Sequence, residues 1–131
     1  MVRRFMFRIP EDEEIIGYIG NFAREKEIRA GFVSAIGSLK NAKLGYFDRD
    51  EGRYLEIDVN ETMELVSAMG NLSIKENSPF PHIHAVLGNR EGKLLGGHLI
   101  EGRVFVAEVY IEGYPEEMVR EKYGNLYLWR T

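Results

Sequence analysis

The segment PFPHIHAVLGNREGKLLGGHL, Pro79–Leu99, contains every histidine of the 131-residue chain. Its apolar runs are separated by the turn-forming residues NREG, a pattern typical of a β-hairpin. His82 and His84 are two positions apart, and alternate side chains of a strand point to the same face. The direction of the third histidine, His98, on the second strand decides whether the three imidazoles meet.

The length of the hairpin loop sets the strand register and therefore the direction of His98. A two-residue loop would place His98 opposite Ile83 and break the cluster, because a one-residue shift moves a side chain to the other face. A three-residue loop over residues 90–92 would place His98 directly opposite His84. Such loops commonly end in a residue with left-handed backbone, where glycine is favoured. Gly92 occupies that position, so the sequence predicts the three-residue loop.

Three imidazoles on one face of a hairpin could bind a single divalent ion. Cross-strand neighbours lie about 4.5–5.5 Å apart at Cβ, and zinc binds histidine nitrogen at about 2.0–2.1 Å. The chain has no cysteine, so histidine and carboxylate groups are the remaining ligands for zinc or another divalent metal. We predict a metal site formed by His82, His84 and His98. The alternative is three hydrogen-bonded strand residues that bind no metal.

A catalytic metal site would also need a general base, and two carboxylates within apolar strands are candidates. Glu64 lies in TMELV and Glu108 in FVAEVYI, although a charge in such a position is more often found at a strand edge or an interface. A turn over residues 100–103 would direct Glu108 to the face opposite the third histidine. Gly96 and Gly97 precede that histidine and predict a bulge or a close backbone approach.

Length and composition indicate one domain, residues 1–131, with a substantial core. Hydrophobic residues make up 44% of the chain and charged residues 29%. The absence of cysteine and glutamine, beside many Glu, Lys and Arg, fits a heat-tolerant cytoplasmic protein. The start, MVRRFMFRIP, is too short and too charged for a secretory signal, and no apolar run approaches a membrane span.

The net charge of −4 argues against a general attraction to nucleic-acid phosphates. Arg3, Arg4 and Arg8 are the best local basic group. On a strand, Arg3 points away from the other two. We therefore expect any contact with DNA to be local and weak.

Periodicity predicts an α+β fold, a mostly antiparallel sheet with two helices. Residues 3–9 alternate as a half-buried strand does, and residues 15–30 have apolar positions at helical spacing. β-rich runs between residues 31 and 111 are separated by short turns, one of them at residues 100–103, which implies antiparallel neighbours. Residues 115–124, PEEMVREKYG, begin with proline and end with glycine, as a short helix does.

Several motifs together resemble those of the plants-and-prokaryotes conserved (PPC) domain, which occurs alone in prokaryotes and in plant AT-hook nuclear proteins. The likeness extends to about Ile111 and rests on GFVSAIGSLKNAKLGYFD, MELVSAMG, PHIHAVL, GNREGKLLGGHL and EGRVFVAEV. It implies an α+β fold, a homotrimer, and a cluster of His82, His84 and His98 that can hold zinc. Members are often described as candidate DNA-binding or transcription-related proteins.

The pattern of residues 103–111, RVFVAEVYI, also favours assembly. One face would carry Val104, Val106 and Tyr110, and the other Phe105, Ala107, Val109 and Ile111. Such a strand needs cover on both faces, because exposed apolar strands promote aggregation. We expect two modest helices to leave one face open and a second copy of the chain, as in the trimers of this family, to cover it.

The chain departs from the plant type of the family in two motifs. It has no Arg-Gly-Arg-Pro hook, and the plant motif Gly-Arg-Phe-Glu-Ile-Leu is present only as ETMELV, which keeps Glu64.

We rank a metal-holding trimeric module with a regulatory or assembly role first, a DNA-binding protein second and a metal-dependent enzyme acting on a small molecule third. A cupin is disfavoured, since Gly88 stands where that motif requires Glu.

Overall fold

A computed structural model describes all residues, 1–131, and contains eight strands and one helix. The helix, α1, spans Ile15–Glu25. The strands are β1 (Arg3–Ile9), β2 (Gly31–Asp48), β3 (Arg53–Val59), β4 (Met63–Lys75), β5 (Ser78–Gly88), β6 (Leu94–Gly113), β7 (Arg120–Tyr123) and β8 (Leu126–Trp129). The helix is too short to cross a lipid bilayer. The predicted mostly antiparallel sheet is confirmed.

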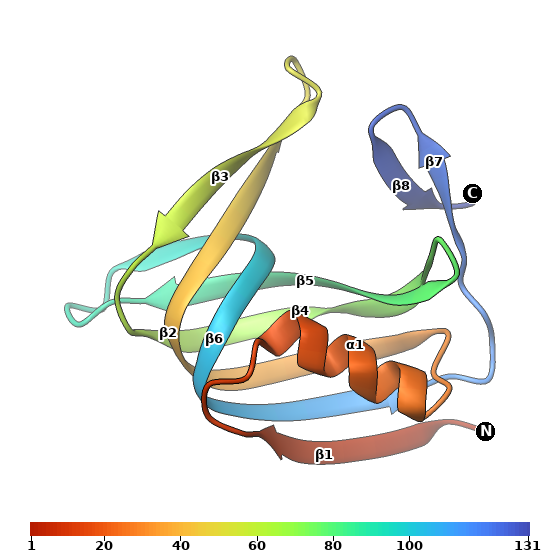
Figure 1. Cartoon of the computed structure of the whole chain (residues 1–131), viewed down its shortest axis with the longest axis horizontal. Helices are drawn as coiled ribbons and strands as arrows, with labels where there is room; N and C mark the ends of the chain where they lie inside the picture. Colours follow the sequence, from red (N-terminus) through yellow and green to blue (C-terminus); the bar gives the residue numbers. More distant parts are fainter.

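Six strands form one antiparallel sheet in the order β1-β6-β5-β4-β2-β3. Since β2 also pairs with β6, the strands β2, β4, β5 and β6 form a closed ring, with β1 and β3 at its margins (Figure 1). Closing a sheet removes unpaired strand edges. The β5–β6 hairpin, which carries the histidines, is part of this ring and is fixed by pairing on both sides.

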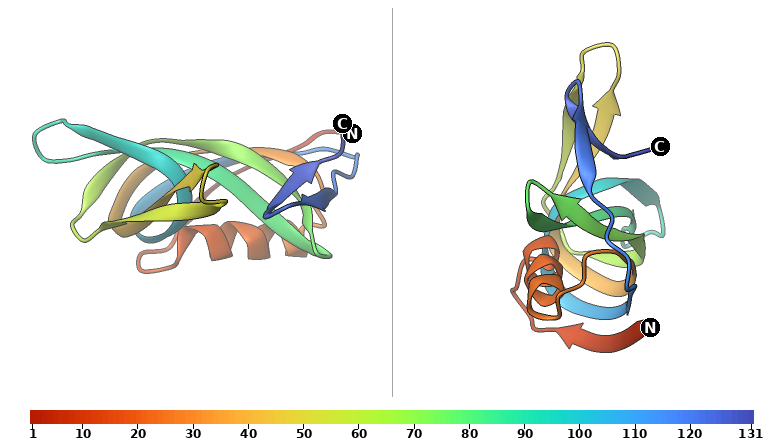
Figure 2. Two further views of the ribbon diagram at one scale, coloured as in Figure 1. Left: turned by 90° about the horizontal axis from the view of Figure 1, so that it is seen from above. Right: turned by 90° about the vertical axis from the view of Figure 1, so that its right-hand side faces the viewer.

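Helix α1 lies along one side of the sheet and covers its inner face (Figure 2). Its buried residues recur at helical spacing and are Ile15, Ile19, Gly20 and Ala23. Glu14 caps the first turn, because its carboxylate accepts hydrogen bonds from the backbone N–H groups of Ile16 and Gly17 at 3.0 and 2.8 Å. The ring of Phe22 stacks on that of Phe7 in β1, with centroids 4.3 Å apart. The first predicted helix is therefore confirmed.

The second predicted helix, over residues 115–124, is wrong, because this segment contains strand β7. Gly124, the expected helix end, has a φ of +61° and forms with Asn125 the two-residue turn between β7 and β8. Arg120 in β7 is only 8% exposed, and its Nε donates a hydrogen bond to Oγ of Ser73 in β4 at 2.7 Å. Contacts with a distant strand thus override the local helical pattern.

The predicted turn at residues 100–103 is also wrong, since β6 continues through it. Register shifts against β2 in this region are bulges, which bend a strand without ending it. A Cβ at Gly102 would lie 2.9 Å from Cδ1 of Leu39, so this glycine permits close packing instead of a turn. Its N–H donates to the carboxylate of Glu14 at 3.0 Å and ties β6 to the helix cap.

The two faces of residues 103–111 are covered unequally. The inner face carries the buried Ala107, Val109 and Ile111. Val104 is buried with them and Phe105 is 48% exposed, because a register shift at Phe105 changes the alternation, so the predicted faces of both residues were wrong. The opposite face of β1, β6, β2, β4 and β5, which we call the outer face, is turned away from α1 and leaves Met6, Ile36 and Met69 exposed in the single chain.

Candidate metal centre

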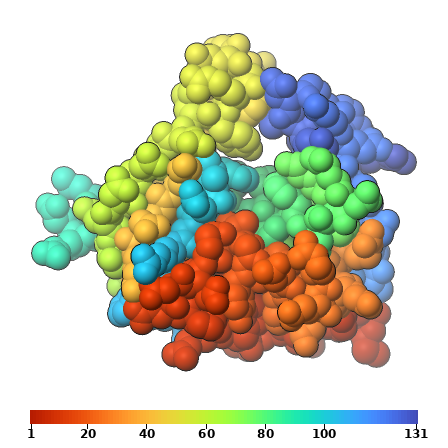
Figure 3. Space-filling model, viewed as in Figure 1, coloured from red at the N-terminus to blue at the C-terminus, as the bar shows by residue number.

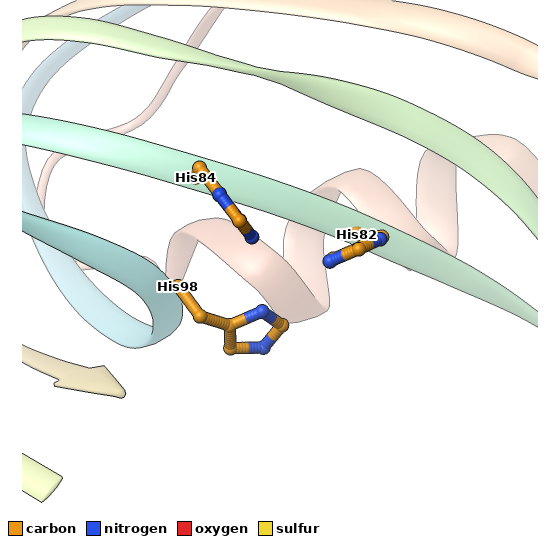
Figure 4. Close-up of side chains that lie close together, drawn as sticks. All are labelled: His82, His84 and His98. Atoms are coloured by element: carbon orange, nitrogen blue, oxygen red, sulfur yellow. The ribbon is translucent and has the colours of Figure 1, made fainter. Parts of the chain in front are cut away.

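The three histidines come together on adjacent strands as the three-residue loop predicts. His84 and His98 are direct cross-strand partners between β5 and β6. His82 lies two residues before His84 on the same strand, so all three side chains share the outer face. Figure 4 shows the rings converging from the two strands.

The loop that sets this register is held by its own hydrogen bonds. The N–H of Asn89 donates to the carbonyl oxygen of Lys93 at 2.9 Å, and the N–H of Gly92 donates to that of Asn89 at 2.9 Å. The side-chain oxygen of Asn89 accepts from the N–H groups of Glu91 and Lys93, both at 2.9 Å. Gly92 has a φ of +80°, the left-handed conformation expected for it. The local sequence therefore determines where His98 lies.

Gly96 and Gly97 allow the backbone of β6 to lie close to the backbones of its two neighbouring strands. A Cβ at Gly96 would lie 2.9 Å from the carbonyl oxygen of Ala85, and one at Gly97 would lie 2.8 Å from that of Gly45. The β5–β6 pairing has no register shift, so the two glycines form no bulge against β5 and the close backbone approach is the alternative that the structure shows. The two glycines let β6 approach β5 on one side and β2 on the other just before His98.

The geometry of the cluster fits a metal ion. The ring centroids are 5.1–5.7 Å apart, and one nitrogen from each ring lies within 4.8 Å of the other two. Two ligands of a tetrahedral zinc ion are about 3.3–3.4 Å apart, so small ring movements would complete the site. His98 Nδ1 is buried and has no hydrogen-bond partner. Since buried polar atoms are normally bonded, this nitrogen is suited to a ligand.

Two histidines of the cluster, His82 and His98, favour the neutral form that binds metal. Burial is the main cause that lowers the pKa of His82 to about 4, and the Arg120 guanidinium and the other two imidazoles contribute to the same shift. Burial also lowers the pKa of His98, with additional effects from His84, Lys75 and Arg120. The neutral imidazole is therefore the dominant form of both residues at pH 7.

Arg120 is a site residue that the sequence did not indicate, because its segment was predicted to be a helix. Its Nη2 contacts Nδ1 of His82 at 3.2 Å and donates to Oδ1 of Asn71 at 2.9 Å. Its Nη1 donates to the carbonyl oxygen of Tyr127 at 3.1 Å, which joins the β7–β8 hairpin to the cluster. Arginine can only donate, so Nδ1 of His82 accepts and carries no proton in this contact.

The two candidate bases lie outside the histidine cluster. Glu64 is exposed and pairs with Gly88 and Ser38 at the far end of β4. Glu108 is exposed on the outer face of β6, opposite Arg8 of β1. A catalytic role for either carboxylate stays a prediction.

The closed antiparallel ring and its three-histidine cluster define a small β-rich protein with a candidate divalent-metal site. Residues 1–114 match the Plants and Prokaryotes Conserved domain, and the chain belongs to this family. The resemblance drawn from the sequence motifs is confirmed. The β7–β8 hairpin, including Arg120, lies beyond the matched residues.

Solved structures of related proteins extend over almost the whole chain. A plant- and prokaryote-conserved protein from Pyrococcus horikoshii is 42% identical, with a TM-score of 0.95 over 98% of this chain and 92% of that one. A metal-containing protein from Archaeoglobus fulgidus is 34% identical, with a TM-score of 0.92 over 98% of this chain and 94% of that one. A candidate DNA-binding protein from Bacteroides thetaiotaomicron is 25% identical, with a TM-score of 0.92 over 97% and 91%.

A curated relative is much longer than this chain. The bifunctional protein GlmU of Synechococcus sp. (strain JA-3-3Ab) is 30% identical over 102 residues, which are 77% of this chain. The chain spans 15% of the length of that protein. The similarity therefore concerns one part of the longer protein.

Proposed function

We propose that this protein is a metal-holding homotrimeric module with a regulatory or assembly role, in which His82, His84 and His98 bind zinc or another divalent ion. The observation that carries the proposal is the convergence of three histidines, one with a buried and unpartnered Nδ1. The metal-containing relative from Archaeoglobus fulgidus supports it. Three protein ligands leave a fourth position open, where zinc could act as a Lewis acid on a bound group.

Metal analysis of the purified protein after incubation with zinc and removal of free ion tests the site. We expect one zinc per chain, and we expect His84→Ala to lose it, because two imidazoles hold zinc far less tightly than three. Met69→Ala is a matched control, since Met69 pairs with His84 and is exposed beside it. A wild-type protein without zinc, or a His84→Ala variant that keeps it, would refute the proposed site.

The trimer is supported by the apolar outer face. Cross-strand pairing forms one row of side chains on the outer face. The row crosses β1, β6, β2 and β4 and then reaches the histidine cluster, in the order Met6, Tyr110, Ser34, Met69, His84 and His98. Met6 is 82% exposed, while Ile36 and Met69 are each 54% exposed. Exposed apolar patches of this kind mark interfaces. A ring of three copies would cover this face and bring the three clusters into one assembly.

Light scattering during size-exclusion chromatography tests the assembly. We expect three times the chain mass of 15.1 kDa. Ile36→Lys should shift the protein toward the monomer, because it places a charge in the proposed interface. Ile57→Lys is the control, since Ile57 is 38% exposed on β3, outside the outer face. A wild-type mass near 15 kDa would contradict the trimer.

DNA binding is the second candidate function, favoured by the name of the Bacteroides relative. Arg4 and Arg8 are exposed on the outer face of β1, on either side of Met6. Arg3 is turned away from them, and its guanidinium reaches the carbonyl oxygen of Glu27 at 3.4 Å. These few charges on an acidic chain favour weak binding at most. A metal-dependent enzyme acting on a small molecule is the third candidate.

A further inference from the structure

A cavity of about 340 Å³ adjoins the histidine cluster, and the rings of His82 and His98 form part of its wall. It opens between the β2–β3 and β7–β8 hairpins, which leave a hollow on the surface (Figure 3). Nδ2 of Asn125 donates a hydrogen bond to the carbonyl oxygen of Gly52 at 2.8 Å and joins the tips of the hairpins. The volume lies at the lower end of the range for small-molecule sites.

Two positive charges line this cavity without an acidic partner. Lys75 and Arg120 take part in no ion pair, although the chain has an excess of acidic residues. Glu56 is the carboxylate in the cavity wall, and it lies 3.5 Å from the ammonium group of Lys43. Charges enclosed by apolar walls attract an opposite charge more strongly than charges in open solvent. The cavity is therefore electrostatically suited to an anion.

The ammonium group of Lys75 is held in place with its hydrogen-bond donors available. It lies 4.8 Å from the ring centroid of Phe80 and 4.6 Å from that of Tyr127, within cation–π distance of both. No oxygen accepts a hydrogen bond from it, so its three N–H donors can serve a ligand. Lys75 is thus the residue that would contact an anion directly.

Arg120 is more rigid and provides a fixed charge. Its hydrogen bonds to Ser73, Asn71 and Tyr127 and its contact with His82 occupy four of the five N–H groups of a guanidinium. Its guanidinium also lies over the ring of Phe80, 5.1 Å from the centroid. One N–H remains for a ligand, and the charge stays at the base of the cavity.

The walls indicate the rest of the ligand. Tyr54, Phe80 and Tyr127 contribute aromatic rings, and the ring of Tyr54 lies 5.1 Å from that of His98. Aromatic walls favour a ligand with an apolar body. We propose that the cavity binds a small organic acid, whose carboxylate faces Lys75 and Arg120 and whose apolar body lies against these rings. The cavity adjoins the metal site of the proposed function, but binding of the acid to the cavity does not depend on a metal.

Titration of the metal-stripped full chain with sodium benzoate, followed by ¹H–¹⁵N NMR after the chelator has been removed by dialysis, tests the inference. Benzoate should give saturable shifts at residues around the cavity, and the uncharged analogue benzamide should bind at least tenfold more weakly. Lys75→Met should also weaken benzoate binding at least tenfold. Lys93→Met is the control, because it removes the same charge from an exposed loop position outside the cavity and should leave the affinity unchanged.

Three outcomes would overturn the inference: no saturable shift with benzoate, equal affinity for benzamide, or unchanged affinity in a folded Lys75→Met variant. Inorganic phosphate provides a further arm, and phosphate binding as tight as benzoate binding would refute an organic acid as the ligand. His84→Ala separates this inference from the metal site, since His84 is not part of the cavity wall. We expect this variant to lose zinc and to keep benzoate binding.

Discussion

Acidification should destabilise the metal-free protein through His82, whose imidazole lies between Arg120 and the other two histidines. Burial, followed by the charge of Arg120, lowers the pKa of His82 from 6.5 to about 4 in the folded state. Between these two pH values the unfolded chain binds more protons at this residue than the folded chain. The contribution of the neutral imidazole to stability is therefore complete above pH 6.5 and is lost as the pH falls toward 4.

The size of the effect follows from the two pKa values of His82. At pH 5, proton linkage gives a loss of about 2 kcal/mol relative to pH 7.5 if the full pKa difference applies. Because the ring is only about half buried, solvent screening reduces this to about 1 kcal/mol. The pKa of His98 is lowered by burial too, so His98 adds to the loss in the same direction.

Urea unfolding at pH 7.5 and pH 5.0, with EDTA present, measures this loss. The comparison uses His82→Gln, which keeps an acceptor for Arg120 but cannot gain a proton. The wild-type protein should lose about 1 kcal/mol more of its unfolding free energy than the variant between the two pH values. An equal loss in both proteins would refute the account of His82 as a partly buried, neutral imidazole.

Three further predictions concern the loop, the core and nucleic acid. Gly92→Ala should lower the unfolding free energy, measured in urea, by about 1–2 kcal/mol. The added Cβ would contact no atom within 4 Å, so the loss comes only from the strain of holding alanine in the left-handed backbone conformation. Gly92→Asn should cost less, and a Gly92→Ala variant as stable as wild type would contradict the loop argument. Ile19→Ala should lower the same free energy by about 2–5 kcal/mol, since Ile19 is fully buried between α1 and the sheet; a loss below this range would show a loosely packed core. Fluorescence anisotropy with duplex DNA should show weak binding that falls steeply with salt, and tight, sequence-selective binding at physiological salt would reverse the ranking of functions.

The hairpin of the cluster was predictable because its information is local. The loop length, the left-handed Gly92 and the two-residue spacing of His82 and His84 all lie within one short segment. Those features fix the register without knowledge of the rest of the fold. The strand β1 and helix α1 were predictable for a similar reason, since each has a regular apolar period.

The errors arose where distant contacts decide the structure. Residues 115–124 have the ends of a helix, but the hydrogen bonds of Arg120 to Ser73 and Asn71 place the segment beside β4. Residues 100–103 have the composition of a turn, but bulges against β2 let β6 continue. The contact of Arg120 with His82 spans 38 positions, and no local pattern indicates it.

Diffraction from zinc-treated crystals at the zinc absorption edge tests the central claim most directly, because anomalous scattering locates the ion itself. The account predicts one anomalous peak per chain, about 2.0–2.1 Å from a ring nitrogen of each of His82, His84 and His98. An absent peak at this cluster, or a peak bound by other residues, would contradict it.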